Sequence, residues 1–320
     1  MQNTTYISLI IPLLNEEESL LPLHKWILDV FNKDSRTYEV IFIDDGSSDN
    51  SWNVISTLTQ KHLNVFGIKF VKNYGKSQAL HAGFAIAKGN YIVTLDSDLQ
   101  DSPEEIPRLV DALINRKLDL ISGWKKKRYD SILFKNIPSK LFNWAARKVS
   151  GIDLHDFNCG LKAYTKEVIK TIDVHGEMHR YIPVMAKWSG FDNIGEKVVE
   201  HQSRKYGVTK FGVERFVNGF LDLMTITFIS RFGKKPMHFF GVIGSLMFLI
   251  GLGLFSYIGG YKVYAMFSDI QADNIANMSG FYIALTSMVI GVQLFLAGFI
   301  AELISRNAQD RNNYQVEKEV

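Results

Sequence analysis

Two carboxylates stand one residue apart in Asp96-Ser97-Asp98-Leu99-Gln100, directly after the apolar run at 91–95. Carboxylate oxygens are the hard ligands that Mg²⁺ prefers in proteins. The apolar run indicates a buried strand, and open α/β sheets bind ligands beyond the carboxyl ends of their strands. The segment therefore predicts a site for a divalent cation that carries a diphosphate. The competing interpretation is a capped turn into a helix, since Pro103-Glu104-Glu105 also opens a helix well.

Polar residues follow three other apolar runs in the same manner. These segments are Pro12 to Glu16, Asp44-Asp45-Gly46-Ser47, and Lys72 to Lys76. Any one of them alone is typical of a turn and a helix cap. Because the carboxyl ends of parallel strands meet at one edge of a sheet, four such segments in order predict one shared site.

The elements that would hold these residues alternate along the first part of the chain. Apolar, β-branched runs predict strands buried on both faces, at 7–11, 39–43, 65–70 and 91–95. Helical spacing of apolar residues predicts helices over 17–31, 49–62 and 76–87. This alternation predicts an α/β fold with a mostly parallel, doubly wound sheet. We also expect strands at 118–122 and 196–202, an amphipathic helix at 131–149, and an interfacial helix at 216–232.

Two uncharged stretches near the end of the chain, 237–261 and 274–301, predict membrane spans. About 20 such residues cross the hydrocarbon core of a bilayer. Basic residues flank the outer ends of the pair, whereas the connector between them holds one lysine and two aspartates. The positive-inside rule then predicts a multi-pass protein with the first part of the chain and both termini in the cytoplasm, and the connector outside.

The expected organisation is a catalytic domain at 1–212, an amphipathic interfacial region at 213–235, membrane helices within 236–305 and a polar tail at 306–320. The spans themselves are expected at about 237–261 and 279–301. A net charge of +3 does not indicate nucleic acid as a partner. The single cysteine, Cys159, excludes an internal disulfide and is expected to be a small packing residue beside the site.

The segments Pro12-Leu13-Leu14-Asn15-Glu16, Asp44-Asp45-Gly46-Ser47 and Asp96-Ser97-Asp98-Leu99-Gln100 together resemble the inverting GT-A glycosyltransferases of family 2. The resemblance is strongest to the polyprenyl-phosphate glycosyltransferases, similar to dolichyl-phosphate mannose synthase and the bacterial undecaprenyl-phosphate enzymes. Asp156-Phe157-Asn158-Cys159-Gly160-Leu161-Lys162 and Arg204 to Lys210 match as well. No Gln-x-x-Arg-Trp motif is present, which argues against the processive polysaccharide synthases.

The resemblance implies a GT-A (Rossmann-like) domain and a role for each matching residue. A first set would hold the base and ribose of a nucleotide diphosphate sugar: Pro12, Leu14, Glu16, Ile43 and Asp45. Ser97 would lie against the nucleotide. Asp96, Asp98 and Gln100 would bind Mg²⁺ or Mn²⁺. Asp101 is expected to be a turn residue and not a ligand.

A second set would gather the phosphates of both substrates. Lys125, Arg204 and Lys210 would contact the donor, and Lys125, Lys135 and Ser139 the acceptor phosphate. The family more often carries arginine at positions 125 and 135, and lysine lacks its bidentate fork. Asp98, Asp156 and Lys125 are the expected catalytic residues. Asp156 is the candidate general base, with a structural or sugar-orienting role as the equal alternative.

The implied reaction transfers one sugar, preferably from a UDP-sugar but also from a GDP-sugar, to a polyprenyl phosphate such as undecaprenyl phosphate, with inversion. A phosphomonoester is largely dianionic at neutral pH and serves as its own nucleophile. The alternatives are a membrane-anchored glycosyltransferase with another lipid or glycan acceptor, and a non-catalytic nucleotide-sugar sensor. Similar enzymes assemble through their membrane helices, so we expect a homo-oligomer, a tetramer by resemblance. The resemblance to bacterial enzymes also implies location in the cell inner membrane.

Overall fold

The computed structural model describes residues 5–126, 150–174, 178–202, 235–268 and 274–307, together with residues 143, 146–148, 224, 228, 232 and 270. The chain divides into two compact units, Met1–Leu223 and Met224–Val320. Each unit has its own internal packing. The expected helices at 131–149 and 216–232 and the polar tail at 306–320 lie wholly or mostly outside the described residues.

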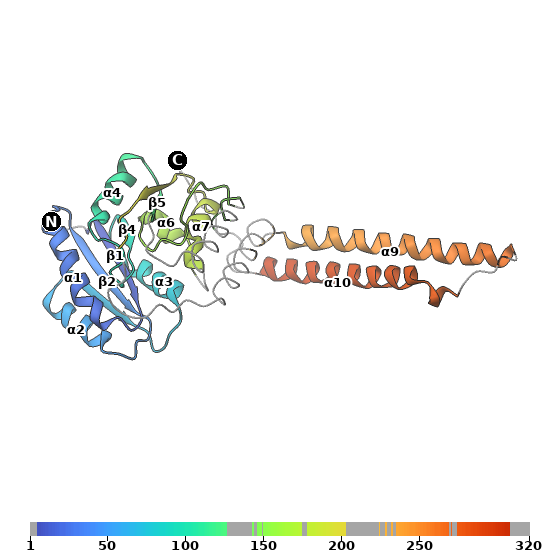
Figure 1. The fold of residues 1–320 in the computed structure, drawn as a ribbon, viewed down its shortest axis with the longest axis horizontal. Coiled ribbons are helices and arrows are strands. Elements are labelled where there is room, and N and C mark those ends of the chain that lie inside the picture. Colours follow the sequence, from blue (N-terminus) through green and yellow to red (C-terminus); the bar gives the residue numbers. More distant parts are fainter. Residues whose placement is uncertain are drawn as a thin grey trace. The chain divides into compact units, whose positions relative to one another are not determined.

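Within the described residues of the first unit, one sheet contains seven strands in the order β3-β2-β1-β4-β6-β5-β7 (Figure 1). They are β1 (Ile7–Leu13), β2 (Tyr38–Asp44), β3 (Val65–Lys69), β4 (Tyr91–Thr94), β5 (Leu120–Trp124), β6 (Lys162–Thr165) and β7 (Ile194–Val198). All pairings are parallel except those of β6, which runs antiparallel to both β4 and β5. The expectation of a mostly parallel α/β sheet is therefore confirmed.

The strand pattern predicted from the sequence differs from the structure in three places. β5 begins two residues later than the expected strand at 118–122, and β7 lies at Ile194–Val198 instead of 196–202. The sequence did not predict β6 at all. Its four residues begin with Lys162 and show no β-branched run, so only its pairing with two neighbouring strands makes it a strand.

Helices cover both faces of the sheet (Figure 1). They are α1 (Glu17–Phe31), α2 (Ser51–Lys61), α3 (Lys76–Ile86), α4 (Glu105–Asn115), α6 (Lys166–Thr171), α7 (Ile182–Trp188) and the short 3₁₀ helix η2 (Met178–Tyr181). One apolar core joins the sheet to α1, α2 and α4, and the other joins it to α3, α6 and α7. In β2, Phe42 belongs to the first core and Ile41 to the second, which explains why the strand is apolar throughout.

The strand order reverses at β1, which lies between β2 and β4. The chain leaves β1 toward β2 and β3 on one side, and later returns to β4 on the other. Loops at the carboxyl ends of these strands diverge at such a point and leave a crevice that binds ligands. The strand that follows in the sheet, β6, starts opposite the end of β4, with Lys162 paired to Thr94. Residues that precede β6 therefore reach the same edge.

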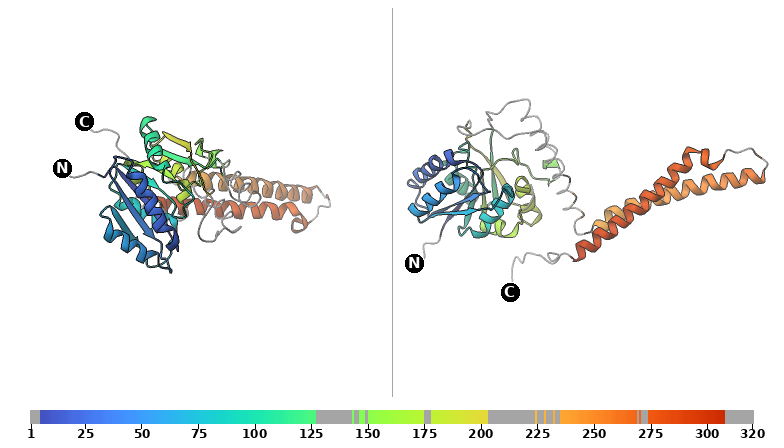
Figure 2. Two further views of the ribbon diagram at one scale, coloured as in Figure 1. Left: turned by 60° about the vertical axis from the view of Figure 1, so that its left-hand side comes forward. Right: turned by 90° about the horizontal axis from the view of Figure 1, so that it is seen from below.

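The second unit contains two long apolar helices, α9 (Pro236–Phe267) and α10 (Ser279–Asn307), with the short η3 (Ile275–Asn277) before α10. Both are long and apolar enough to cross a membrane. They lie side by side in both views of Figure 2. Many of their large apolar side chains, such as Leu249, Phe255 and Phe299, are exposed. A water-soluble helix pair would leave a polar face outside, so this pattern favours lipid as the surroundings.

Glycines bring the backbones of α9 and α10 into contact. A Cβ on Gly244 would lie 2.6 Å from the carbonyl oxygen of Gly291, and a Cβ on Gly291 would lie 2.6 Å from that of Gly244. Ser287 adds a hydrogen bond across the pair, donating its hydroxyl to the Met247 carbonyl at 2.8 Å. Small residues at a helix–helix interface allow this close approach in membranes.

We expect Gly244→Ala to lower the apparent melting temperature of the full chain in detergent, because the new methyl must push α10 away. A matched control is Gly253→Ala on the same helix, where a Cβ would meet nothing within 4 Å. Alanine has the higher helix propensity by about 1 kcal/mol, so the control should melt at the same temperature or higher. Equal melting of the two variants would contradict close packing at Gly244.

Candidate active site

The loops after β1 and β2 are bound to each other by polar side chains. The Asn15 backbone N–H donates to Ser47 Oγ at 2.9 Å, and the Asn15 side-chain oxygen accepts the Ser48 N–H at 2.8 Å. Glu16 N–H donates to Ser51 Oγ at 3.0 Å. Asn15 has a φ of 55°, in the left-handed region that asparagine tolerates better than most residues. These bonds bring the two polar segments predicted for the nucleotide to one edge of the sheet.

Asp45 holds a third loop. Its two carboxylate oxygens accept the backbone N–H groups of Tyr74 at 2.7 Å and Gly75 at 2.9 Å. Burial raises the pKa of Asp45, although the two hydrogen bonds act in the opposite direction. Gly46 next to it has a φ of 77°, and a Cβ there would lie 2.4 Å from the backbone carbon of Lys72. The Asp45-Gly46 pair therefore shapes the loop that leads into α3.

Of the other residues predicted to hold the nucleotide, Leu14 and Glu16 are half-buried and Pro12 is buried in the crevice wall. Ile43 is completely buried in the apolar core beneath α3.

Asp96 and Asp98 follow β4 at the crevice. The Asp96 side chain is 30% exposed, and its Oδ1 lies 2.5 Å from the Lys76 Nζ. Burial alone would raise the pKa of Asp96, but the positive charges of Lys76, Lys125 and Lys162 hold it well below its usual range. Burial, followed by the negative charge of Asp96, raises the pKa of Asp98 to about 6. The two carboxylates are thus close enough to repel each other.

The turn after these carboxylates is strained. Leu99 is buried and has a φ of 60°, an uncommon conformation for a residue with a branched side chain. Its neighbours are half-buried Gln100, whose N–H donates to Asp98 Oδ1 at 3.2 Å, and buried Ser97. Backbone strain of this kind concentrates at functional sites, where the surrounding structure enforces it.

Asp101, expected as a turn residue, takes part in a buried ion pair. Its side chain is 0% exposed, and its Oδ1 lies 2.7 Å from the Lys125 Nζ. His201 Nδ1 lies 3.6 Å from the same oxygen, and a β-bridge joins Asp101 to His201. The Lys125 side chain is 12% exposed, and its ammonium group is paired with Asp101. A buried carboxylate needs such a partner, and the partner comes from the end of another strand.

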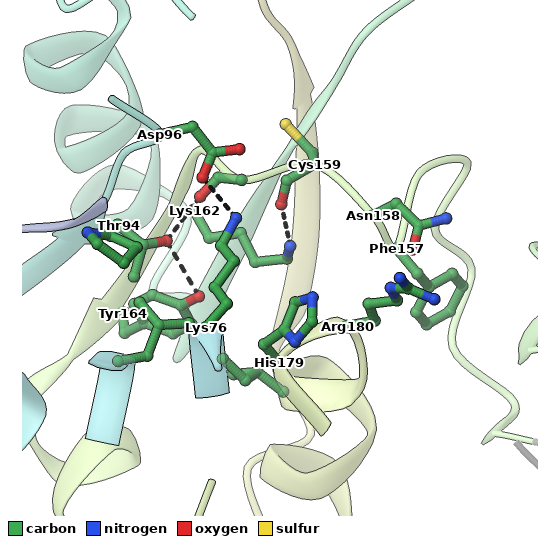
Figure 3. A pocket seen from close by; sticks show the side chains of 14 residues that line it. Lys76, Thr94, Asp96, Phe157, Asn158, Cys159, Lys162, Tyr164, His179 and Arg180 are labelled. Atoms are coloured by element: carbon green, nitrogen blue, oxygen red, sulfur yellow. Dashed lines mark hydrogen bonds and ion pairs between the residues drawn. The ribbon is translucent and has the colours of Figure 1, made fainter. Parts of the chain in front are cut away.

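A small cavity lies beneath Asp96 (Figure 3). Its wall combines charged, polar and apolar side chains from both sides of the crevice. The lining residues are Pro12, Lys76, Leu80, Thr94, Asp96, Phe157, Asn158, Cys159, Gly160, Lys162, Tyr164, His179, Arg180 and Ile182. Gly160 is required here because a Cβ would lie 2.3 Å from Asp96 Oδ2. The segment before β6 therefore closes over the first carboxylate.

Comparison with known proteins decides the family. The model described as glycosyl transferase family 2 matches residues 8–173. A dodecaprenyl-phosphate galacturonate synthase from Rhizobium johnstonii is 33% identical over 94% of this chain and 88% of its own length. The chain is a family 2 glycosyltransferase.

Other relatives and a solved structure agree with this assignment. The transferase is 33% identical to an undecaprenyl-phosphate 4-deoxy-4-formamido-L-arabinose transferase from Aeromonas hydrophila, over 97% of this chain and 92% of the relative. Glucosyl-3-phosphoglycerate synthase from Mycobacterium tuberculosis, solved with Mn²⁺, UDP-glucose and phosphoglyceric acid, has a TM-score of 0.51 at 20% identity. That likeness covers 71% of this chain and 79% of the other, and it shows the GT-A fold alone.

Of the remaining predicted residues of the glycosyltransferase, the structure describes Asp156 and Cys159. Asp156 is buried, and its Oδ1 accepts the Asn158 N–H at 3.1 Å while Ser122 Oγ donates to its carbonyl at 3.3 Å. It does not line the cavity. Cys159 is buried and does line it, and burial raises the pKa of its thiol to about 12, which fits a packing role. Four predicted positions lie outside the described residues: Lys135, Ser139, Arg204 and Lys210.

Lys162, His179 and Arg180 are among the cavity residues that had no predicted role. Lys162 belongs to a motif that the sequence singled out, and the motif itself was the available signal. The His179 Nδ1 atom forms a hydrogen bond with Ser77 Oγ at 3.1 Å. Arg180 follows His179 on η2. No spacing marks these two in the sequence, because η2 reaches the crevice only through its packing against α3 and α7.

We expect Gly160→Ala to weaken Mn²⁺-dependent binding of UDP or GDP by roughly tenfold or more, since a displacement near 1 Å at a site can cost about 100-fold. Asp96 must move to admit the methyl group. The measurement is a nucleotide titration of the purified full chain with Mn²⁺, with Gly253→Ala as the control. Unchanged nucleotide affinity in a folded Gly160→Ala protein would show that the position of Asp96 is unimportant.

Proposed function

We propose that this glycosyltransferase moves one sugar from a nucleotide diphosphate sugar, a UDP-sugar by preference, to a polyprenyl phosphate such as undecaprenyl phosphate, with inversion. The observation that carries the proposal is the carboxylate pair Asp96 and Asp98 at the end of β4, beside a crevice shaped by Asp45. The polyprenyl-phosphate relatives align over nearly the whole chain, including the apolar helices.

Mg²⁺ or Mn²⁺ fits the carboxylate pair. Burial, and then the charge of Asp96, raise the pKa of Asp98, and a divalent cation would stabilise both carboxylates in their ionised form. Mg²⁺ is usually bound by one or two carboxylates together with substrate phosphates, so Asp96, Asp98 and Gln100 would suffice. Related folds are solved with Mn²⁺ or Mg²⁺ and UDP. When bound, the metal would neutralise charge on the departing diphosphate.

The chain's own residues would position two anionic substrates and offset their repulsion. Lys125 lies at the crevice beside Asp101, and the family resemblance adds Lys135, Ser139, Arg204 and Lys210 as phosphate ligands. The acceptor phosphate is already an anionic nucleophile, and its attack opposite the diphosphate inverts the anomeric carbon. No general base is required, which agrees with a buried Asp156 that accepts a backbone N–H. Catalysis then depends on positioning and charge stabilisation.

The apolar helices would keep the reaction at the cytoplasmic face of the inner membrane, where the lipid phosphate is confined. Two helices of sufficient length and the exposed apolar side chains along them support a multi-pass arrangement. The basic residues flanking the pair support cytoplasmic termini. Assembly into a homo-oligomer, a tetramer by resemblance, belongs to the same proposal.

We expect Asp98→Asn to reduce sugar transfer by at least about 100-fold, because it removes a charge that would bind the cation and through it the leaving group. The assay incubates washed membranes with polyprenyl phosphate and a panel of UDP- and GDP-sugars, and identifies the glycolipid by mass. Asp29→Asn on α1, an exposed position, is the matched control. Wild-type turnover in Asp98→Asn, or a product on diacylglycerol or a glycan only, would overturn the proposal.

The raised pKa of Asp98 gives a separate prediction without turnover. A cation binds the ionised carboxylate, and the Asp98 carboxyl keeps its proton up to about pH 6. Mn²⁺ binding should therefore release more protons at pH 6 than at pH 8, and the Mn²⁺ affinity should fall as the pH drops below 6. Calorimetric titrations in two buffers of different ionisation enthalpy count the protons. Equal release at both pH values would exclude Asp98 as a ligand with this pKa.

A further inference from the structure

Arg180 is a nearly buried cation that has no partner within the described part of the chain. Its side chain lines the cavity beneath Asp96, and the residue is 9% exposed. Figure 3 shows no hydrogen bond or ion pair from its guanidinium to the other lining residues. Arginine remains charged at any ordinary pH and presents five donors in a planar fork. A guanidinium that lines a cavity and has no anionic partner is ready to bind an anionic group there, so the arrangement points to an anionic ligand.

The charges along the cavity wall favour the same conclusion. Lys76 is paired with Asp96. Lys162 is buried, and its ammonium group donates to the uncharged carbonyl of Cys159. Burial lowers the pKa of Lys162, so its charge is not counted here. Lys76 and Arg180 then face one carboxylate, Asp96, in the cavity wall. A neutral ligand would leave the charge of Arg180 uncompensated.

The position of the cavity indicates which part of a substrate enters it. Asp96 belongs to the wall, and under the proposed function it binds the metal–diphosphate group of the donor. The transferred sugar is bonded directly to that diphosphate and must lie next to it. Asn158, an exposed residue of the wall, offers an uncharged polar group for a sugar hydroxyl.

The acceptor phosphate is the other anion that the reaction contains. Lys125, the described member of the set predicted to bind it, does not line the cavity and is paired with Asp101. We propose that Arg180 binds a carboxylate carried by the transferred sugar, so that the donor is a nucleotide-activated uronic acid. This inference rests on the proposed function and names the donor class for the same site.

A carboxylate matches the guanidinium through two parallel hydrogen bonds. The hydroxymethyl group of the corresponding neutral sugar has no charge and cannot form that pair. Sites built around a buried polar partner reject an analogue that lacks it by large factors. Arg180 would therefore select the sugar without contacting the atoms that react.

The test compares donors that differ only in this group: UDP-glucose with UDP-glucuronate, UDP-galactose with UDP-galacturonate, and GDP-mannose with GDP-mannuronate. The purified full chain is titrated with each in the presence of Mn²⁺. In at least one pair we expect the acidic donor to bind about 100-fold more tightly. In Arg180→Gln that preference should fall below about fivefold, with the affinity for UDP or GDP alone retained.

Arg108→Gln, the same substitution at an exposed position on α4, is the matched control and should keep the preference. Arg180→Lys keeps the charge without the planar fork and should lose about tenfold, which provides a second variant if Arg180→Gln does not fold. Equal affinity for both members of every pair would overturn the inference, as would a preference that survives in Arg180→Gln. So would a loss of polyprenyl-phosphate binding as the sole effect of Arg180→Gln.

Failure of the inference is separable from failure of the proposed function. Transfer of a neutral sugar to polyprenyl phosphate at full rate would overturn the inference and leave the proposed function intact. Tight, Arg180-dependent binding of an acidic donor without any transfer to polyprenyl phosphate would uphold the inference and refute the proposed acceptor.

Discussion

Mutual repulsion among the carboxylates at the end of β4 is the constraint on which the site depends. Asp96, Asp98 and Asp101 lie within one turn of chain, and burial makes their charges costly. Lys76 is paired with Asp96, and Lys125 is paired with Asp101. Burial and the negative charge of Asp96 raise the pKa of Asp98. The lysines come from the start of α3 and the end of β5, so the local charge balance exists only when the sheet is complete.

The sequence was sufficient for much of the first half of the sheet. The strands β1 to β4 and the helices between them have strong, uninterrupted periodicity, and all of them were predicted. The carboxylate motif, Asp45 and the two apolar helices could be identified for the same reason, since each is a local pattern. Together, these local patterns were enough to predict a family 2 glycosyltransferase from this sequence.

What the sequence could not supply depends on contacts between distant segments. β6 is a strand only because β4 and β5 flank it, and Asp101 is a buried ion-pair partner only because Lys125 reaches it. Arg180 carries no motif, and its position in the cavity wall follows from the packing of a single 3₁₀ turn. Asp45 was expected to contact ribose, yet its visible partners are two backbone N–H groups. Such partnerships cannot be derived from spacing along the chain.

The reversed direction of β6 has an evolutionary consequence. Because the strand runs against β4, the chain contributes to the crevice on its way into the strand, through Asn158, Cys159 and Gly160, and not on its way out. The carboxylates that would bind the diphosphate, Asp96 and Asp98, and this part of the cavity wall beside the sugar thus belong to separate stretches of the gene. Gly160 is confined by its contact with Asp96, but selection can remodel the rest of that wall while the carboxylates stay fixed. Descendants of a common ancestor could therefore acquire new donors without rebuilding the chemistry of transfer.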